Sequence, residues 1–187
     1  MTLLFLVLLG MSPMQGTSPV AVAMGHYPGW RGCPIEFDIA ANWVAERVEP
    51  DAGRDEQCAV EVKPSDLEER LATNDIDVYT IRVSLLRPSR FLDVAQKYFT
   101  FRHGRWYIEG RSGVLDEATV IQGEPWSGLE GVATGGCSST SGGYAGLCEV
   151  PFILMDDEKE NIWMMEGGAQ SSPAFDLIKK TLRLHRR

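Results

Sequence analysis

Nucleophilic side chains gather in the glycine-rich stretch of residues 135–143. They are Cys137, Ser138, Ser139 and Ser141. Gly136 directly precedes Cys137, which makes Cys137 a candidate thiol nucleophile of a hydrolase, with His26 or His103 as the general base. The serines lack the G-x-S-x-G pattern that exposes a nucleophilic serine on a tight turn. A hydrolase that uses Cys137 or a loop serine is therefore the least favoured hypothesis, and we expect no catalytic residue.

The four cysteines of the chain are Cys33, Cys58, Cys137 and Cys148. An even number of cysteines in an exported protein indicates disulfides, and four cysteines permit three pairings. The local pairs Cys33–Cys58 and Cys137–Cys148 are favoured, and the second would leave Cys137 inert as a nucleophile. Zinc is the alternative, but the chain has no C-x-x-C pair and only 3 histidines. The sequence therefore predicts two disulfides, no metal site and no cofactor.

The first 23 residues contain no charged side chain. An apolar run over residues 3–9 is followed by small and polar residues that end in Ala21-Val22-Ala23. This order is typical of a secretory signal peptide, in which an apolar stretch of about 7–15 residues precedes an A-x-A cleavage site. The run is much shorter than the about 20 residues of a membrane-spanning helix. A buried N-terminal strand is the alternative. The sequence predicts a signal peptide over 1–23 and an exported protein, periplasmic or secreted, without stable membrane insertion.

Composition and charge are those of a folded, acidic protein. The chain has 187 residues, of which 44% are hydrophobic and 24% are charged, as in ordinary globular domains. Acidic side chains number 26 against 18 basic ones, so that the net charge is −8. This charge disfavours nucleic acid as a partner and favours a basic protein. We expect residues 24–187 to form one domain.

Acidic side chains form two clusters in segments that are expected to be turns. The first covers residues 156–160, and calcium binding there is one interpretation, although the segment lacks the glycine and the final glutamate of an EF-hand loop. The second cluster consists of Glu46, Glu49, Asp51, Asp55, Glu56 and Glu61. The simpler interpretation is that both clusters are solvated surface.

The glycine-rich stretch also has the character of a contact loop. Seven glycines lie from Gly128 to Gly146, and a loop restrained at its base by a disulfide enters a partner's cleft at a lower ordering cost. The fragment Ser141-Gly142-Gly143-Tyr144 is similar to the Ser-Gly…Tyr signature of bacterial lysozyme inhibitors, with one residue instead of two before the tyrosine. The resemblance implies that Ser141, Gly142, Gly143 and Tyr144 bind a partner. A passive flexible turn is the alternative, and Trp126 is a further candidate contact residue.

Hydrophobic periodicity predicts an α+β domain with a mostly antiparallel sheet flanked by helices. Strands are expected over residues 35–39, 44–48, 58–62, 77–86, 98–102, 105–109, 118–122, 128–134, 144–154 and 161–166. Helices are expected over residues 64–71, 91–98 and 173–182. His103-Gly104 is a turn signal between two of the strands, and residues 49–57 are expected to be an exposed loop.

Two stretches together resemble PsbP-like proteins. Phe37-Asp38-Ile39 followed by Asn42-Trp43 resembles their opening strand, turn and tryptophan. The end of the chain, with a hairpin, an acidic turn, a strand and a helix from Ser172, resembles their closing elements. The resemblance implies a PsbP-like α+β domain, of a family in which many bacterial members are exported and not known to be enzymes. The four cysteines and the glycine-rich loop depart from the pattern, so that only the fold is carried over.

Three hypotheses follow for the function. The first is a non-enzymatic, exported protein-binding domain, an inhibitor or immunity factor against a secreted or cell-wall-acting enzyme or toxin. The second is an accessory or assembly module of an envelope complex. The third is the hydrolase described above.

Overall fold

The computed structural model describes residues 24–30, 32–67, 69, 80–110, 113–122, 126–138, 144–157, 161–167 and 173–184. The first strands are β1 (Met24–Tyr27), β2 (Ile35–Ala40), β3 (Trp43–Val48), β4 (Glu56–Pro64) and β5 (Ile81–Leu86). The next are β6 (Phe99–Arg102), β7 (Arg105–Glu109), β8 (Leu115–Glu117) and β9 (Thr119–Ile121). The last are β10 (Ser127–Ser138), β11 (Tyr144–Asp156), β12 (Ile162–Gly167) and β13 (Arg183–Leu184). The helices are η1 (Ala52–Arg54), α2 (Phe91–Tyr98) and α3 (Pro173–Thr181).

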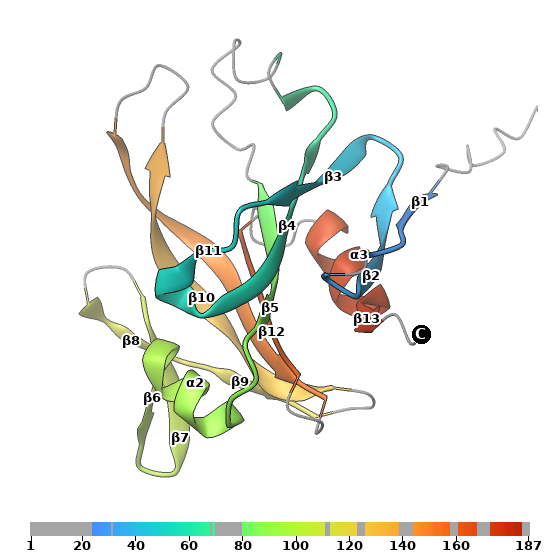
Figure 1. The fold of residues 1–187 in the computed structure, drawn as a ribbon. Helices are drawn as coiled ribbons and strands as arrows, with labels where there is room; N and C mark the ends of the chain where they lie inside the picture. Colours follow the sequence, from blue (N-terminus) through green and yellow to red (C-terminus); the bar gives the residue numbers. More distant parts are fainter. Residues whose placement is uncertain are drawn as a thin grey trace, which may run out of the picture.

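Seven strands form the central sheet, in the order β3-β4-β5-β12-β11-β10-β9, and every neighbouring pair is antiparallel. One side of the sheet faces α3 and the small sheet β1-β2-β13, whereas the other faces α2 and the small sheet β6-β7-β8 (Figure 1). The expected single α+β domain with a mostly antiparallel sheet is therefore confirmed.

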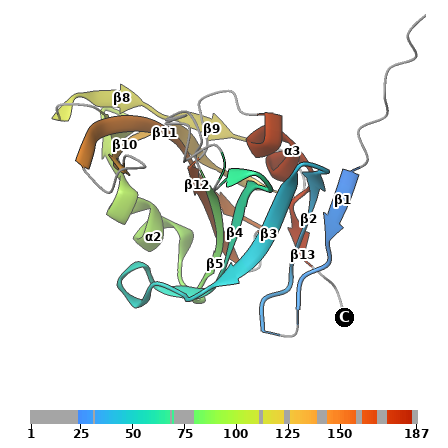
Figure 2. The same ribbon diagram turned by 90° about the horizontal axis from the view of Figure 1, so that it is seen from above.

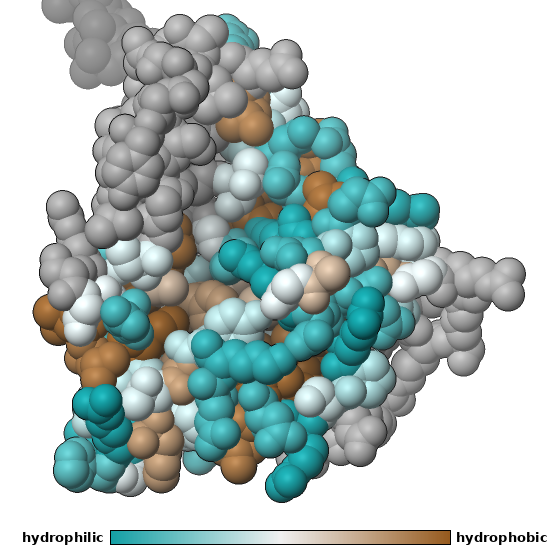
Figure 3. All heavy atoms as spheres, turned by 60° about the vertical axis from the view of Figure 1, so that its left-hand side comes forward, coloured by the Kyte–Doolittle hydropathy of each residue, from teal (hydrophilic) through white to brown (hydrophobic). Residues whose placement is uncertain are grey.

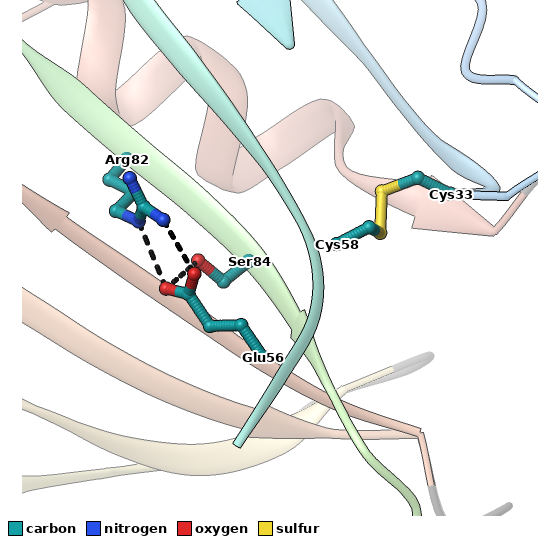
Figure 4. The surroundings of a disulfide bond; sticks show 5 residues. All are labelled: Cys33, Glu56, Cys58, Arg82 and Ser84. Atoms are coloured by element: carbon teal, nitrogen blue, oxygen red, sulfur yellow. Dashed lines mark hydrogen bonds and ion pairs between the residues drawn. A yellow bond between two sulfur atoms is a disulfide. The ribbon is translucent and has the colours of Figure 1, made fainter. Parts of the chain in front are cut away.

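The α3 side of the sheet is closed by an apolar core. Alternate residues of β5 and β12 point into it, among them Val83, Trp163 and Met165, and Phe175 and Ile178 of α3 cover them. Trp163 is fully buried. A disulfide joins Cys33, just before β2, to Cys58 on β4 (Figure 4). The predicted Cys33–Cys58 pair is thus confirmed, and it fixes the small sheet to the central one.

The α2 side of the sheet has a second apolar core, formed by the opposite faces of the same strands. Its buried residues are Leu86, Val94, Ala95, Phe99, Ile108, Ala118, Leu129, Phe152, Leu154, Ile162 and Met164. The β6–β7 hairpin covers part of it, and its turn has positive φ at His103 (50°) and Gly104 (78°). This geometry suits a tight hairpin turn, and the turn expected at His103-Gly104 is confirmed.

Charged side chains replace the apolar core on this face where β4 meets β5. The carboxylate of Glu56 accepts hydrogen bonds from Arg82 Nε (2.9 Å) and Nη2 (2.5 Å), from Ser84 Oγ (2.7 Å) and from the Asp51 backbone N–H (2.7 Å). Figure 4 shows Arg82 and Ser84 converging on this carboxylate. Beside it, Arg54 of η1 is paired with Glu166 of β12. Burial by itself raises the pKa of Glu56, but these hydrogen bonds outweigh it and hold the pKa below its usual range.

The interpretation of the second acidic cluster as solvated surface was therefore wrong for Glu56, whose side chain is fully buried. The sequence suggested an exposed loop over residues 49–57, but β4 begins at Glu56, directly after η1. Arg82, which is 26 residues away, satisfies its charge. The expectation of a solvated carboxylate failed because the pairing is between strands and has no local signal.

Three short strands were not predicted, namely β1, β8 and β13. Each has only two to four residues, too few to show a hydrophobic period. Each is identified as a strand through its hydrogen-bonded pairing with a longer neighbouring strand. The predicted signal peptide over 1–23 lies outside the described residues, as do residues 68, 70 and 71 of the helix expected over 64–71. Its first residue, Pro64, ends β4.

Candidate functional site

The longest feature of the molecule is the hairpin of β10 and β11, with 12 and 13 residues. Its register runs without interruption from Ser127 opposite Asp156 to Cys137 opposite Gly146, and then shifts at Ser138. The hairpin therefore continues four residues beyond Thr134, where the sequence placed its end. In Figure 1 its outer end lies at the upper left, away from α2 and α3.

An open cavity of about 530 Å³ lies beside the base of this hairpin. Its walls come from β8, β9, β10, β11 and the first turn of α3. The acidic residues that line it are Asp116, Glu117, Glu130, Glu149 and Asp176. Its apolar lining includes Val132, Pro151 and Phe175. We call this cavity the acidic groove.

A glycine allows the wall of the acidic groove to come close to the hairpin. A Cβ atom at Gly131 of β10 would lie 2.7 Å from Ile108 Cγ2 of β7, which is closer than real Cβ contacts. Because Gly131 has no side chain, β7 crosses β10 at short range, and β8 beside it brings Asp116 and Glu117 to the groove. On the other wall, Lys179 Nζ of α3 forms an ion pair with Glu130 Oε2 of β10 at 2.6 Å.

The five carboxylates of the acidic groove differ in how they are neutralised. Glu130 is paired with Lys179, and Glu117 is paired with Arg105 at 2.7 Å. Asp116, Glu149 and Asp176 are exposed, and within the described part of the chain no lysine or arginine forms an ion pair with them. The side of the molecule that carries β8, β10 and β11 is largely hydrophilic, with separate hydrophobic patches (Figure 3). The groove can therefore attract cations of a partner.

The predicted contact loop lies at the outer end of the same hairpin. Ser141, Gly142 and Gly143 lie outside the described residues, and Tyr144 begins β11 with its backbone opposite Ser138. The backbone register places Cys137 opposite Gly146 and Cys148 opposite Gly135. The side chains of both cysteines are outside the described part, so the Cys137–Cys148 disulfide stays a prediction.

Trp126 is placed in the structure as a packing residue. Its ring lies edge-on to Trp163 with a centroid distance of 5.7 Å, and its Nε1–H donates a hydrogen bond to the Leu182 carbonyl at 3.1 Å. It is partly buried against the apolar core below α3. These contacts join the start of β10 to the end of α3, and a role in binding a partner stays a prediction for Trp126.

Of the residues of the hydrolase hypothesis, the structure describes both histidine side chains but only the backbones of Cys137 and Ser138. His26 on β1 bonds through Nδ1 to Asp38 Oδ1 at 2.9 Å, and His103 occupies the turn between β6 and β7. In Figure 1, β1, the β6–β7 turn and the outer end of β10 lie at three separate places, and Cys137 is the residue before the last of β10. A nucleophile and a base within hydrogen-bond reach, as covalent catalysis requires, are not seen among the residues that the structure places.

The acidic turn after β11 is only partly described. Asp157 accepts hydrogen bonds from the backbone and the side-chain amide of Asn161, at 3.2 and 2.8 Å, and residues 158–160 lie outside the described part. Over the described ranges, no three His, Cys, Asp or Glu side chains are close enough to hold a metal ion. Calcium binding by residues 156–160 stays a prediction.

The acidic groove itself was missed by the sequence analysis. Its carboxylates come from β8, β10, β11 and α3, and Asp116 is separated from Asp176 by most of the C-terminal half of the chain. None of them belongs to the two acidic clusters seen in the sequence. Only the strand order, which places β9 at the sheet edge next to β10, could have indicated that they lie together.

The chain was compared with family models, curated proteins and solved structures. No family model, curated protein or solved structure matches it. Among the helices that the structure describes, none is long and apolar enough to cross a membrane. The PsbP-like resemblance and the similarity to lysozyme inhibitors therefore stay predictions.

Proposed function

We propose that this chain is an exported, non-enzymatic domain that binds and inhibits a basic secreted or cell-wall-acting enzyme. The observation that carries the proposal is the acidic groove beside the long β10–β11 hairpin. Asp116, Glu149 and Asp176 supply negative charge that no described lysine or arginine pairs with, and complementary charge steers an oppositely charged partner into the correct orientation.

The loop at the end of the β10–β11 hairpin is the part of this surface that would enter the partner's cleft. Its two strands are paired as far as Cys137 and Gly146, so that the loop at its end is presented on an ordered support. Pre-ordering of an inserting segment lowers the entropic cost of binding. The similarity of Ser141-Gly142-Gly143-Tyr144 to the signature of lysozyme inhibitors supports a cleft that cleaves sugars as the target.

The test uses the purified chain and a lysozyme-type muramidase, with inhibition and the association rate measured at several salt concentrations. Tyr144→Ala should weaken inhibition through a faster dissociation. Glu149→Gln combined with Asp176→Asn should slow association about tenfold and flatten its salt dependence, because rim charges act mainly on the on-rate. Glu46→Gln is the control, since Glu46 is an exposed carboxylate on β3, at the opposite edge of the central sheet.

Inhibition that survives both Tyr144→Ala and the neutralised groove would contradict the proposal, as would the absence of any binding to the muramidase. Capture of a stable complex from an envelope extract, with no effect on enzyme activity, would favour an accessory module.

A further inference from the structure

Basic side chains are concentrated in one segment of this acidic chain. Residues 80–105 contain six lysines and arginines and a single carboxylate, that of Asp93, although the whole chain has a net charge of −8. Arg82, Lys97 and Arg105 are paired with carboxylates of other segments. The remaining three are Arg87, Arg90 and Arg102. No described carboxylate forms an ion pair with them.

Part of this segment lines a cavity of about 180 Å³ between η1 and the connection from β5 to α2. Its polar lining includes the cations Arg54, Arg87 and Lys97, the hydroxyl of Ser89 and one carboxylate, Asp55. Leu86 and Val94 provide a buried apolar lining. We call it the basic cavity. In Figure 2, the teal turn that contains η1 lies at the lower edge of the molecule, whereas β8 and β9 of the acidic groove lie at the upper edge.

The start of α2 adds donors next to this cavity. Arg90 precedes the helix in an extended conformation, and its side chain makes no capping hydrogen bond. Pro88 and Ser89, which line the cavity, lead directly into this end. An uncapped helix start has free backbone N–H groups and a partial positive charge, and both favour anions.

The three cations are not equally available to a ligand. Arg54 is held by Glu166 and by Asp51, so it contributes mainly a fixed charge. Lys97 Nζ lies 2.5 Å from Asp55 Oδ2, and a bound anion would compete with Asp55 for it. Arg87 is exposed and bonds through its backbone N–H to the Asp55 carbonyl at 2.8 Å. Arg87 therefore has a fixed backbone and a guanidinium that no described carboxylate pairs with.

We propose that the basic cavity binds a phosphate group, carried either by a small solute or by a lipid headgroup. Guanidinium and ammonium groups and a serine line the cavity beside the start of α2, and the several oxygens of a phosphate use such a set better than the two of a carboxylate. The proposal goes beyond the inhibitor function, because the basic cavity shares no lining residue with the acidic groove.

Asp55 offers a variant that should improve binding. Its φ is 58°, a left-handed conformation that asparagine also tolerates. Asp55→Asn removes the carboxylate that competes for Lys97 without a change of shape. We therefore expect Asp55→Asn to tighten phosphate binding by about tenfold, and Arg87→Ala to weaken it by about tenfold, as for the gain or loss of one charge-assisted hydrogen bond. Arg102→Ala is the matched control, since it removes an exposed arginine outside the cavity and should leave binding unchanged.

The experiment measures binding to the full chain by calorimetry, with inorganic phosphate and glycerol 3-phosphate at constant ionic strength. A second arm measures co-sedimentation with phosphatidylcholine vesicles, with and without phosphatidylglycerol. Binding in the first arm assigns the site to a free phosphate, and binding in the second arm alone assigns it to a headgroup. Far-UV circular dichroism checks that each variant is folded.

The proposal is overturned if the wild-type chain binds neither kind of probe. It is also overturned if Arg102→Ala weakens binding as much as Arg87→Ala, because the effect would then come from general surface charge. Unchanged binding by Asp55→Asn would equally contradict the role given to Lys97.

Discussion

The two faces of the central sheet are stabilised in different ways. Below α3, apolar side chains and the Cys33–Cys58 disulfide close the core. On the α2 side, the apolar core stops at the β4–β5 end, and Glu56, Arg82 and Ser84 replace it. The same strands supply both faces, since alternate residues point to opposite sides. The difference shows that one sheet can be closed by apolar packing and a disulfide on one face, and by apolar packing together with a buried charge pair on the other.

The largest effect is expected from loss of volume on the α3 face. Trp163→Ala removes a fully buried indole and should lower the free energy of unfolding by about 3–5 kcal/mol, through lost burial and the cavity left behind. Urea denaturation followed by circular dichroism measures it. Phe101→Ala is the control, because Phe101 is 55% exposed and its loss should cost about 0.5 kcal/mol. Equal effects of the two changes would contradict the assignment of the core.

Loss of the disulfide should come next. The bond closes a loop with a sequence separation of 25, for which restriction of the unfolded chain predicts about 3.5 kcal/mol. The double variant Cys33→Ser with Cys58→Ser, measured by urea denaturation, should show this loss. A reducing agent should remove this stabilisation from the wild type, whereas in the double variant it can act only on the predicted Cys137–Cys148 bond. If the wild type is insensitive to reduction, the small sheet does not depend on the bond.

A slightly smaller loss is expected when the charge pair on the α2 face is broken. Glu56→Ala leaves the guanidinium of Arg82 without its partner and should cost about 3 kcal/mol. The matched control is Glu46→Ala, which removes an exposed carboxylate paired with Lys63 and should cost no more than about 1 kcal/mol.

The same pair also makes stability depend on pH. Because the pKa of Glu56 is lowered in the folded state, its contribution is present above the ordinary glutamate pKa of about 4.3 and is lost as pH falls through the lower, folded value. Glu56→Gln should therefore lose less stability than the wild type below about pH 4. Parallel acid-unfolding curves of the two proteins would contradict this assignment.

The smallest effect tests one contact at the edge of the α3 face. Trp126→Phe removes the hydrogen bond from Nε1 to the Leu182 carbonyl but keeps an aromatic ring against Trp163. It should cost about 1 kcal/mol in urea denaturation. If the same variant also weakens binding to the muramidase, Trp126 is a contact residue as well.

Local patterns predicted the parts of the fold that depend on local sequence. The alternation in β2, the helical face of α2 and the turn at His103-Gly104 are each visible within a few residues, and each is confirmed. Cys33 and Cys58 were paired by their position in the chain. The burial of Glu56 was missed because its partner lies on another strand.

The candidate site was predictable only in part. The β10–β11 hairpin and its glycine-rich loop follow from the sequence, since glycines and alternating residues mark them directly. The acidic groove does not, because Asp116, Glu149 and Asp176 come together only once β8, β11 and α3 are assembled. The basic cavity was not predictable from the sequence either, since its lining residues on η1 and α2 come together only through tertiary packing.

The order of strands in the central sheet has a consequence for how the chain reaches its native state. β5, from the first half of the chain, is paired on one side with β4 and on the other with β12, whose residues lie some 80 positions later (Trp163 opposite Leu85). Until β12 is synthesised, β5 has an open edge, and strands β9, β10 and β11 cannot join the half of the sheet formed by β3, β4 and β5. Such distant pairings slow folding, so the sheet must assemble late, after nearly all of its strands have been synthesised.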